Sequence, residues 1–148
     1  MASFFFLKSK NYSTPYQVKS FTIRNLYNKD IISFEEELKK QPISIIYVFS
    51  SWCSVCATNH QMLNEIKKTN LVKIYGIAWK DLQQNIKNFL QKYNNPFVLI
   101  GYDNNDILNK SLPITGVPEL FLVNSQRQIL FHLAGRIAKA DFHQIIKI

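Results

Sequence analysis

Hydrophobic and polar positions along the chain alternate between strand-like runs and helix-like stripes. Residues 43–49 form an apolar run, rich in β-branched side chains, of the length of a fully buried strand. Residues 71–79 form a second such run, and shorter apolar runs occupy 97–100 and 120–123. Apolar residues recur at helical spacing after the first two runs. Strands that alternate with helices in this way predict an α/β domain around a mixed β-sheet.

Local start and stop signals add further elements to this pattern. An alternation at Phe21 and Ile23 predicts a strand within residues 16–26. Ser33 with Glu36 has the form of a capping box and predicts a short helix over residues 34–40. Asp81 is expected to cap the helix that follows the second long strand.

The last third of the chain reads as a short helix, a hairpin and a closing helix. The polar residues 103–106 lack the spacing and the closing glutamate of a calcium loop, and instead predict a turn that caps a helix over residues 107–112. The run at 120–123 is followed by a turn, and residues 129–133 are expected to return antiparallel to it. Phe142, Ile145 and Ile146 give the closing helix its buried face.

Two cysteines stand where the first long strand ends and a helix begins. Cys53 and Cys56 form a C-x-x-C after Trp52. This position places Cys53 near the unpaired N–H groups and the positive dipole end of the helix, which favour a thiolate. Cys56, one turn inside the helix, is placed to attack a mixed disulfide formed at Cys53. The spacing therefore favours redox chemistry.

Other functions for the cysteine pair stay open on these residues alone. A structural disulfide over so short a loop would constrain the unfolded chain little. A zinc site needs about four ligands, and His60, four residues after Cys56, is one of only three histidines that could contribute. Two buried thiols with a purely packing role are the remaining alternative.

Composition narrows the class of protein. The chain has 148 residues, 47% of them hydrophobic and 14% aromatic, which excludes a disordered chain and fits one domain. The net charge is +8, but the basic residues form separate short patches and no nucleic-acid-binding motif accompanies them. We expect the charge to provide solubility and long-range attraction to an acidic partner, not nucleic-acid binding.

The first 14 residues lack the pattern of strands and helices that the rest of the chain shows. Residues 1–14 predict a flexible tail and residues 15–148 a single domain. Within the tail, residues 2–7 are apolar but far too short to span a bilayer. They are either an ordinary exposed start or the remnant of an N-terminal membrane anchor.

Motifs outside the cysteine pair narrow the interpretation further. Trp52-Cys53-x-x-Cys56 is followed by Tyr75-Gly76-x-x-x-Lys80-Asp81, by Asn95-Pro96-Phe97 and by Gly116-Val117-Pro118-Glu119. With the Ala134-Gly135-Arg136 segment, this series resembles the thiol:disulfide interchange proteins of the DsbE/CcmG type, which act in cytochrome c maturation. The resemblance covers residues 16–148, and the wider superfamily includes the TlpA/ResA proteins.

The resemblance implies a fold and a site. The fold is a thioredoxin fold, a central mixed sheet flanked by helices, with an N-terminal strand extension. Cys53 and Cys56 would be the catalytic dithiol, and Trp52, Val117, Pro118 and Glu119 would belong to the substrate groove. The Val117–Pro118 bond would be cis. Glu119 would affect thiol protonation or bind a partner, with a solvent-facing glutamate as the alternative.

The resemblance also implies a cellular setting. Neither a cofactor nor a metal is expected. The substrate would be a disulfide of apocytochrome c or of a haem-ligation factor, and electrons would come from a membrane thiol-disulfide carrier. We expect a periplasmic monomer, held at the inner membrane by an N-terminal anchor in the full-length protein.

Three departures from the relatives concern the cysteine pair. Asn59 stands where many relatives carry a carboxylate, three residues after the second cysteine. Tyr47 stands where thioredoxins have a buried aspartate. Both usual proton acceptors for Cys56 are therefore replaced, and Glu119 or water would have to substitute. Ser54-Val55 also lacks the proline common between the cysteines, so a reduction potential cannot be transferred from relatives.

Two other functions compete with cytochrome maturation. The first is general extracytoplasmic thiol:disulfide exchange of the TlpA/ResA kind. The second, from a different class, is a copper or zinc chaperone that binds metal through Cys53, Cys56 and His60. The direction of electron flow stays open, because the same scaffold serves oxidants and reductants.

Overall fold

The computed structural model describes residues 9–10 and 16–147. The strands are β1 Ser9–Lys10, β2 Tyr16–Gln17, β3 Thr22–Asn25, β4 Ile31–Ser33, β5 Ile43–Phe49, β6 Lys73–Trp79, β7 Leu99–Asp103, β8 Glu119–Asn124 and β9 Gln128–Ala134. The helices are α2 Phe34–Leu38, α3 Ser54–Lys68, α4 Gln83–Tyr93, α5 Lys139–Ile146 and a 3₁₀ turn, η1 Leu108–Lys110.

One mixed sheet runs through the molecule, with the strand order β1-β9-β8-β5-β6-β7-β3-β4. Its central strand β5 lies parallel to β6 and antiparallel to β8. The short strand β2 also pairs with β9, at a different part of that strand from β1. The residues before β5 therefore form strands at both edges of the sheet, since β3 pairs with β7 at the other edge. The expected α/β domain with a mixed sheet and an N-terminal strand extension is confirmed.

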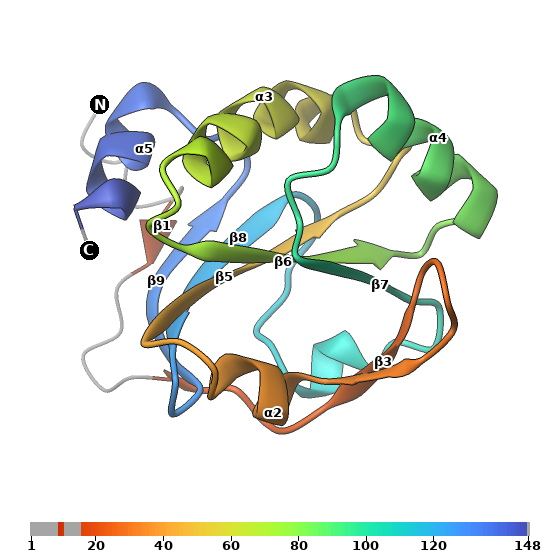
Figure 1. Ribbon diagram of the computed structural model, residues 1–148, viewed down its shortest axis with the longest axis horizontal. Coiled ribbons are helices and arrows are strands. Elements are labelled where there is room, and N and C mark those ends of the chain that lie inside the picture. The colour runs from red at the N-terminus through yellow and green to blue at the C-terminus, as the bar shows by residue number, and fades with distance from the viewer. Residues whose placement is uncertain (1–8, 11–15, 148) are drawn as a thin grey trace.

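Helices cover both faces of this sheet (Figure 1). Helices α3, α4 and α5 lie on one face, and α2 with the short turn η1 lies on the other. Alternate side chains of β5 supply the two cores: Ile45, Tyr47 and Phe49 face α3 and α4, whereas Ile46 and Val48 face α2 and η1. A strand buried on both faces explains why residues 43–49 read as one continuous apolar run.

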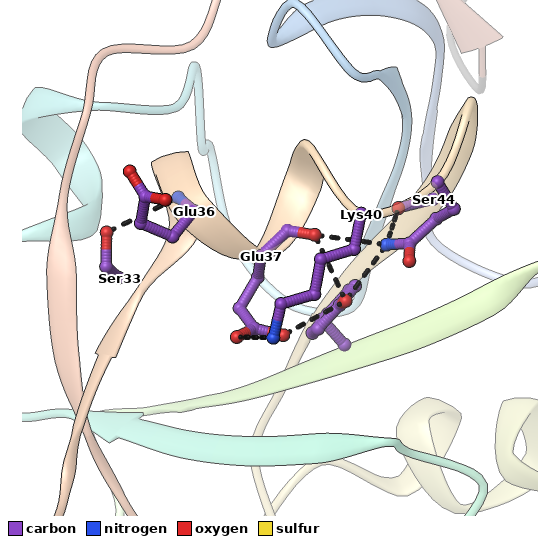
Figure 2. Close-up of polar contacts among 7 residues, drawn as sticks. Ser33, Glu36, Glu37, Lys40 and Ser44 are labelled. Atoms are coloured by element: carbon purple, nitrogen blue, oxygen red, sulfur yellow. Dashed lines mark hydrogen bonds and ion pairs between the residues drawn. The ribbon is translucent and has the colours of Figure 1, made fainter.

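The short helix α2 is fixed by polar contacts at both ends (Figure 2). Ser33 accepts a hydrogen bond from the backbone N–H of Glu36, as the capping pattern predicts. Near the other end, Lys40 pairs with the Glu37 carboxylate at 2.7 Å. The buried hydroxyl of Tyr75 on β6 reaches the same glutamate at 3.3 Å, which ties α2 to the sheet.

Several element boundaries differ from the sequence prediction. The capping role predicted for Asp81 is wrong: Leu82 is the N-cap of α4 and provides no side-chain cap. Strand β7, predicted to begin at Phe97, begins at Leu99. The N–H of Phe97 is instead held by the Asn95 side chain. Strand β4 was not expected, because only Ile32 of its three residues is buried and so leaves little pattern.

The N-terminal segment is described only in part. Ser9–Lys10 pair with β9, while residues 1–8 and 11–15, including the apolar stretch interpreted as an anchor remnant, lie outside the described residues. Within the part of the chain that the structure describes, no helix has the length and apolar character needed to cross a membrane.

Candidate active site

Cys53 occupies the N-cap position of α3, with extended backbone angles of φ −97° and ψ 114°. Its Sγ accepts a hydrogen bond from the backbone N–H of Cys56 at 3.2 Å, the bond that a serine or aspartate side chain usually accepts at this position. A negative charge on this sulfur would therefore meet a hydrogen-bond donor and the positive end of the helix dipole. Both cysteines are free thiols; Cys53 is partly exposed and Cys56 is fully buried.

The turn that carries Cys53 is held from the neighbouring strand. Asp81, just after β6, accepts hydrogen bonds from the Ser51 N–H at 2.6 Å and from the Ser51 hydroxyl at 2.8 Å. The Ser50 hydroxyl donates to the Trp79 carbonyl at 2.5 Å, and the Trp52 indole donates to the Lys80 carbonyl at 3.0 Å. The β5–α3 turn is thus fastened to the end of β6 by three side chains.

Asp81 is a positioning residue that sequence reasoning missed. It was interpreted as a helix cap, although it belongs to the Tyr75-Gly76-x-x-x-Lys80-Asp81 motif. Its carboxylate also accepts from the N–H of Leu82, but its other contacts reach back to the cysteine turn. A motif acid that follows a strand parallel and adjacent to the cysteine strand was the available signal, because such strands end at the same edge of the sheet.

The segment before β8 forms the other wall of the site. The Val117–Pro118 peptide bond is cis, as the resemblance implied. The Val117 carbonyl oxygen lies 4.0 Å from Cys53 Sγ. The structure therefore brings Trp52, Cys53, Val117 and Pro118 together at one end of the sheet.

Glu119 lies beneath this segment and not on its surface. Its side chain is 1% exposed, so the solvent-facing alternative is wrong. Oε1 accepts from the backbone N–H groups of Thr115 at 2.5 Å and Gly116 at 2.7 Å, and Oε2 contacts His132 Nε2 at 2.5 Å. Burial raises the pKa of Glu119, but the contacts with His132, Thr115 and Gly116 outweigh burial and hold this pKa below its ordinary value.

His132 is a second residue that the sequence did not single out. It lies on β9, opposite Phe121 of β8, and its ring stacks on Phe121 with centroids 4.3 Å apart. This stacking places Nε2 against the Glu119 carboxylate. Glu119 and His132 together support the segment 115–118 from below.

Cys56 lies in a nearly water-free setting behind Cys53. Burial, followed by the hydrogen bond with Cys53, raises the pKa of Cys56 well above that of an ordinary thiol. The neighbouring Asn59 uses its side chain elsewhere: it donates to the Gly135 carbonyl at 3.0 Å and accepts from the Ile137 N–H at 2.9 Å. Asn59 therefore fastens α3 to the segment between β9 and α5.

His60 does not join the cysteines in a metal site. Its ring is fully buried among aromatic side chains, with the centroids of Phe49, Phe89 and Phe97 between 4.8 and 5.6 Å away. Burial lowers the pKa of His60 to about 4, so the ring is neutral at pH 7. Among the described residues, no three His, Cys, Asp or Glu side chains lie close enough together to hold a metal ion.

An apolar surface, formed by Trp52 and Leu82, lies at the cysteine turn and at the Asp81 turn bonded to it. Trp52 is 62% exposed although its indole N–H is fixed, and Leu82, which follows Asp81, is 69% exposed. Large exposed apolar side chains beside a reactive sulfur suit contact with a partner chain. A solvent-accessible N-cap thiol, a buried thiol one turn behind it and a nearby backbone segment form the geometry of a dithiol–disulfide site.

Comparison with known sequences places this geometry in a family. The sequence model described as thioredoxin-like matches residues 41–129, which include the cysteine turn and the Val117–Pro118 segment. The chain belongs to the thioredoxin-like family. Within it, the chain is 27% identical over 129 residues to the thiol:disulfide interchange protein DsbE of Vibrio cholerae, covering 87% of this chain and 69% of that protein.

A second relative and a solved structure agree with this placement. The thiol:disulfide interchange protein CycY of Rhizobium leguminosarum is 33% identical over 96 residues, covering 65% of this chain and 52% of that protein. A secreted thiol-disulfide isomerase from Corynebacterium glutamicum has the same thioredoxin-like fold, with a TM-score of 0.79 and 14% identity over 94% of this chain and 89% of that one. The chain spans only 52% of the length of CycY.

Proposed function

We propose that this protein is a thiol:disulfide reductase with Cys53 and Cys56 as its dithiol. Cys53, as a thiolate, attacks one sulfur of a partner disulfide, so that a mixed disulfide forms and the other partner sulfur leaves as a thiolate. Cys56 then attacks Cys53 Sγ, which forms the Cys53–Cys56 disulfide and releases the first partner sulfur. Two electrons pass from the dithiol to the partner.

One observation carries this proposal. The Cys53 sulfur is partly exposed at the N-cap of α3, 4.0 Å from the Val117 carbonyl, while Cys56 is fully buried one turn behind. A partner sulfur can therefore reach Cys53 but not Cys56. This arrangement separates the attacking thiol from the resolving thiol, as thiol–disulfide exchange requires.

The apolar surface and the segment 115–118 give the partner a place to bind. The partner's chain would lie in extended form beside Val117, in the manner of a strand added to a sheet edge. Trp52 would cover the disulfide from the other side, with its indole fixed to the Lys80 carbonyl. Pro118 lacks an N–H, so the backbone hydrogen bonds to the partner chain would come from the residues beside it.

The cellular role follows from the resemblance to the DsbE/CcmG type. We propose that the substrate is a disulfide of apocytochrome c or of a haem-ligation factor, and that a membrane thiol-disulfide carrier re-reduces Cys53 and Cys56. The protein would act in the periplasm, held at the inner membrane by an N-terminal anchor in the full-length protein. The names of the relatives DsbE and CycY support thiol:disulfide exchange.

The reduction potential of the dithiol tests the direction of the reaction. The protein would be equilibrated in thiol buffers of defined potential while tryptophan fluorescence, to which Trp52 contributes beside the cysteines, is followed. Cys56→Ser is the control that cannot form the disulfide. A potential near or below about −200 mV supports a reductase. A potential near about −120 mV, typical of a strong oxidant, would overturn the proposal.

A peptide substrate separates cytochrome maturation from general exchange. C-x-x-C-H is the haem attachment sequence of c-type cytochromes, so the probe is its intramolecular disulfide, and the control is the same peptide with the histidine replaced. An enzyme dedicated to cytochrome c maturation should reduce the C-x-x-C-H peptide faster than the control peptide. Equal rates with both peptides would favour the general exchanger of the TlpA/ResA kind.

A further inference from the structure

Tyr47 is a fully buried tyrosine whose hydroxyl has no hydrogen-bond partner in the part of the chain that the structure describes. It lies on β5, six residues before Cys53, and its side chain faces the core shared by Cys56. An unpaired buried hydroxyl loses its hydrogen bonds to water on folding, so it destabilises the folded protein unless another state supplies a partner. A phenylalanine would fill the same space without this loss.

Asn59, His60 and Cys56 lie around this hydroxyl, and both ring nitrogens of His60, like the hydroxyl itself, have no hydrogen-bond partner among the described residues. The Asn59 amide is occupied by the Gly135 carbonyl and the Ile137 N–H. The His60 ring, 6.5 Å from the Tyr47 ring between centroids, is enclosed by phenylalanines. Tyr47 and Cys56 belong to the same buried core, and the interaction between the hydroxyl and the thiol acts against the burial that raises the pKa of Cys56.

The resolving step creates the acceptor that the hydroxyl lacks. In the mixed disulfide, Cys56 must lose its proton before its sulfur can attack Cys53, and the thiolate then lies in an apolar interior. Ionised carboxylates cannot donate a hydrogen bond to it, and those of Glu119 and Asp81 are already held, Glu119 by His132 and two backbone N–H groups and Asp81 by Ser51. The Cys56 thiolate therefore needs a neutral donor.

We propose that the Tyr47 hydroxyl donates a hydrogen bond to the Cys56 thiolate as Cys56 attacks the Cys53–partner disulfide, an inference that rests on the proposed reductase function. Tyr47 keeps its own proton throughout. The Cys53–Cys56 bond forms and the bond from Cys53 to the partner sulfur breaks. The proton released by Cys56 ends on the departing thiolate of an ordinary thiol, or in solvent when the departing thiol is acidic enough to stay ionised.

The protonation properties of the neighbours suit this role. Burial raises the pKa of Tyr47 well above that of an ordinary tyrosine, so the hydroxyl is a donor and not a base at pH 7. His60, with a pKa lowered to about 4 by burial, is too weak a base to take the Cys56 proton. A hydrogen bond to a buried thiolate needs only the donor that Tyr47 supplies.

A two-step reaction with 5,5′-dithiobis(2-nitrobenzoate) tests this inference. Attack by Cys53 releases one thionitrobenzoate in a bimolecular step, and attack by Cys56 releases the second in a unimolecular step, so the absorbance separates them. Tyr47→Phe removes only the hydroxyl. We expect the second step to slow about tenfold, because the Cys56 thiolate loses a hydrogen-bond donor in an apolar interior, while the first step stays unchanged.

The matched control is Tyr75→Phe, which removes a buried hydroxyl from the neighbouring strand β6 on the opposite face of the sheet. It should leave both steps unchanged. The pH midpoint of the second step should rise in Tyr47→Phe, a change that a purely structural role would not cause. Thermal unfolding of the reduced proteins checks that Tyr47→Phe is folded, and we expect its melting temperature to be at or above that of the wild type.

The outcomes distinguish this inference from the proposed function. A second step with the same rate and pH midpoint in Tyr47→Phe and wild type would overturn the role of Tyr47 and leave the dithiol mechanism standing. A slow second step in His60→Phe with a normal one in Tyr47→Phe would also overturn it, in favour of His60. Absence of the second step in the wild type would overturn the proposed function itself.

Discussion

Glu119 stabilises the segment that faces Cys53, because its buried carboxylate accepts several hydrogen bonds from that segment at once. Glu119→Ala would remove the carboxylate that accepts hydrogen bonds from the N–H groups of Thr115 and Gly116 and contacts the ring of His132. We expect a loss of about 3 kcal/mol in the free energy of unfolding, measured by urea denaturation. Glu119→Gln, which retains one acceptor oxygen, should lose less. Equal stability of Glu119→Ala and wild type would contradict this account.

The same carboxylate makes stability depend on pH. Because the folded state holds the pKa of Glu119 below its ordinary value, its contribution is present above the unfolded pKa of about 4.3 and is lost as pH falls through the folded pKa. The difference in unfolding free energy between wild type and Glu119→Gln should therefore shrink below about pH 4. Denaturation curves of both proteins from neutral to acidic pH measure it. A difference that grows on acidification would show that the sign is wrong.

Asp81 should affect reactivity more than its distance from Cys53 in the sequence suggests. Asp81→Ala removes the acceptor for the Ser51 N–H and hydroxyl. We expect the free energy of unfolding to fall by about 2 kcal/mol and the attack of Cys53 on a small disulfide to become slower. Asp103→Ala is the matched control, because the Asp103 carboxylate holds the backbone N–H groups of Ile107 and Leu108 instead. If both variants slow the attack equally, general destabilisation and not the cysteine turn explains the effect.

Strand β6 packs against the core through a position without a side chain. A Cβ at Gly76 would lie 2.7 Å from the Phe97 ring, which is stacked against Phe49 and cannot withdraw easily. Gly76→Ala should therefore destabilise the protein by about 2 kcal/mol, measured by urea denaturation. Gly116→Ala, whose added Cβ meets no atom of the described residues within 4 Å, is the control for steric effects. Adding Phe97→Leu should recover part of the loss, and no recovery would argue against the clash.

Elements with strong periodic patterns could be predicted from the sequence, and short ones could not. Helix α3 follows the first long apolar run as expected, because apolar residues at helical spacing are a local signal. Strand β4 and the start of α4 were missed or misplaced because they depend on tertiary partners: β4 pairs with β3, and Asp81 bonds to Ser51 thirty positions earlier. The cysteine pair was visible in sequence, whereas its supports Asp81 and His132 required the strand order.

The arrangement of the whole sheet explains how distant motifs meet at one site. Strands β5 and β6 are parallel neighbours, so the cysteine turn and the Asp81 turn leave the sheet at the same edge. Strand β8 runs antiparallel to β5, so its first residues, beginning at Glu119, lie at that edge as well. Three segments separated by up to 64 positions, from Cys53 to Val117, are thereby brought together.

The net charge of +8 should influence which disulfides reach this edge. A positive protein attracts anionic reagents, and added salt screens the attraction over a Debye length of about 10 Å at 0.1 M ionic strength. The rate of Cys53 attack on dianionic 5,5′-dithiobis(2-nitrobenzoate) should therefore fall about threefold as sodium chloride is raised to about 0.5 M, while that on dicationic cystamine should rise. Stopped-flow rates with each reagent across the salt series measure this. Comparing slopes and not absolute rates removes the difference in intrinsic reactivity between the reagents. Equal slopes for the two reagents would show that the net charge does not influence association at the site. They would argue against the expected attraction of an acidic partner.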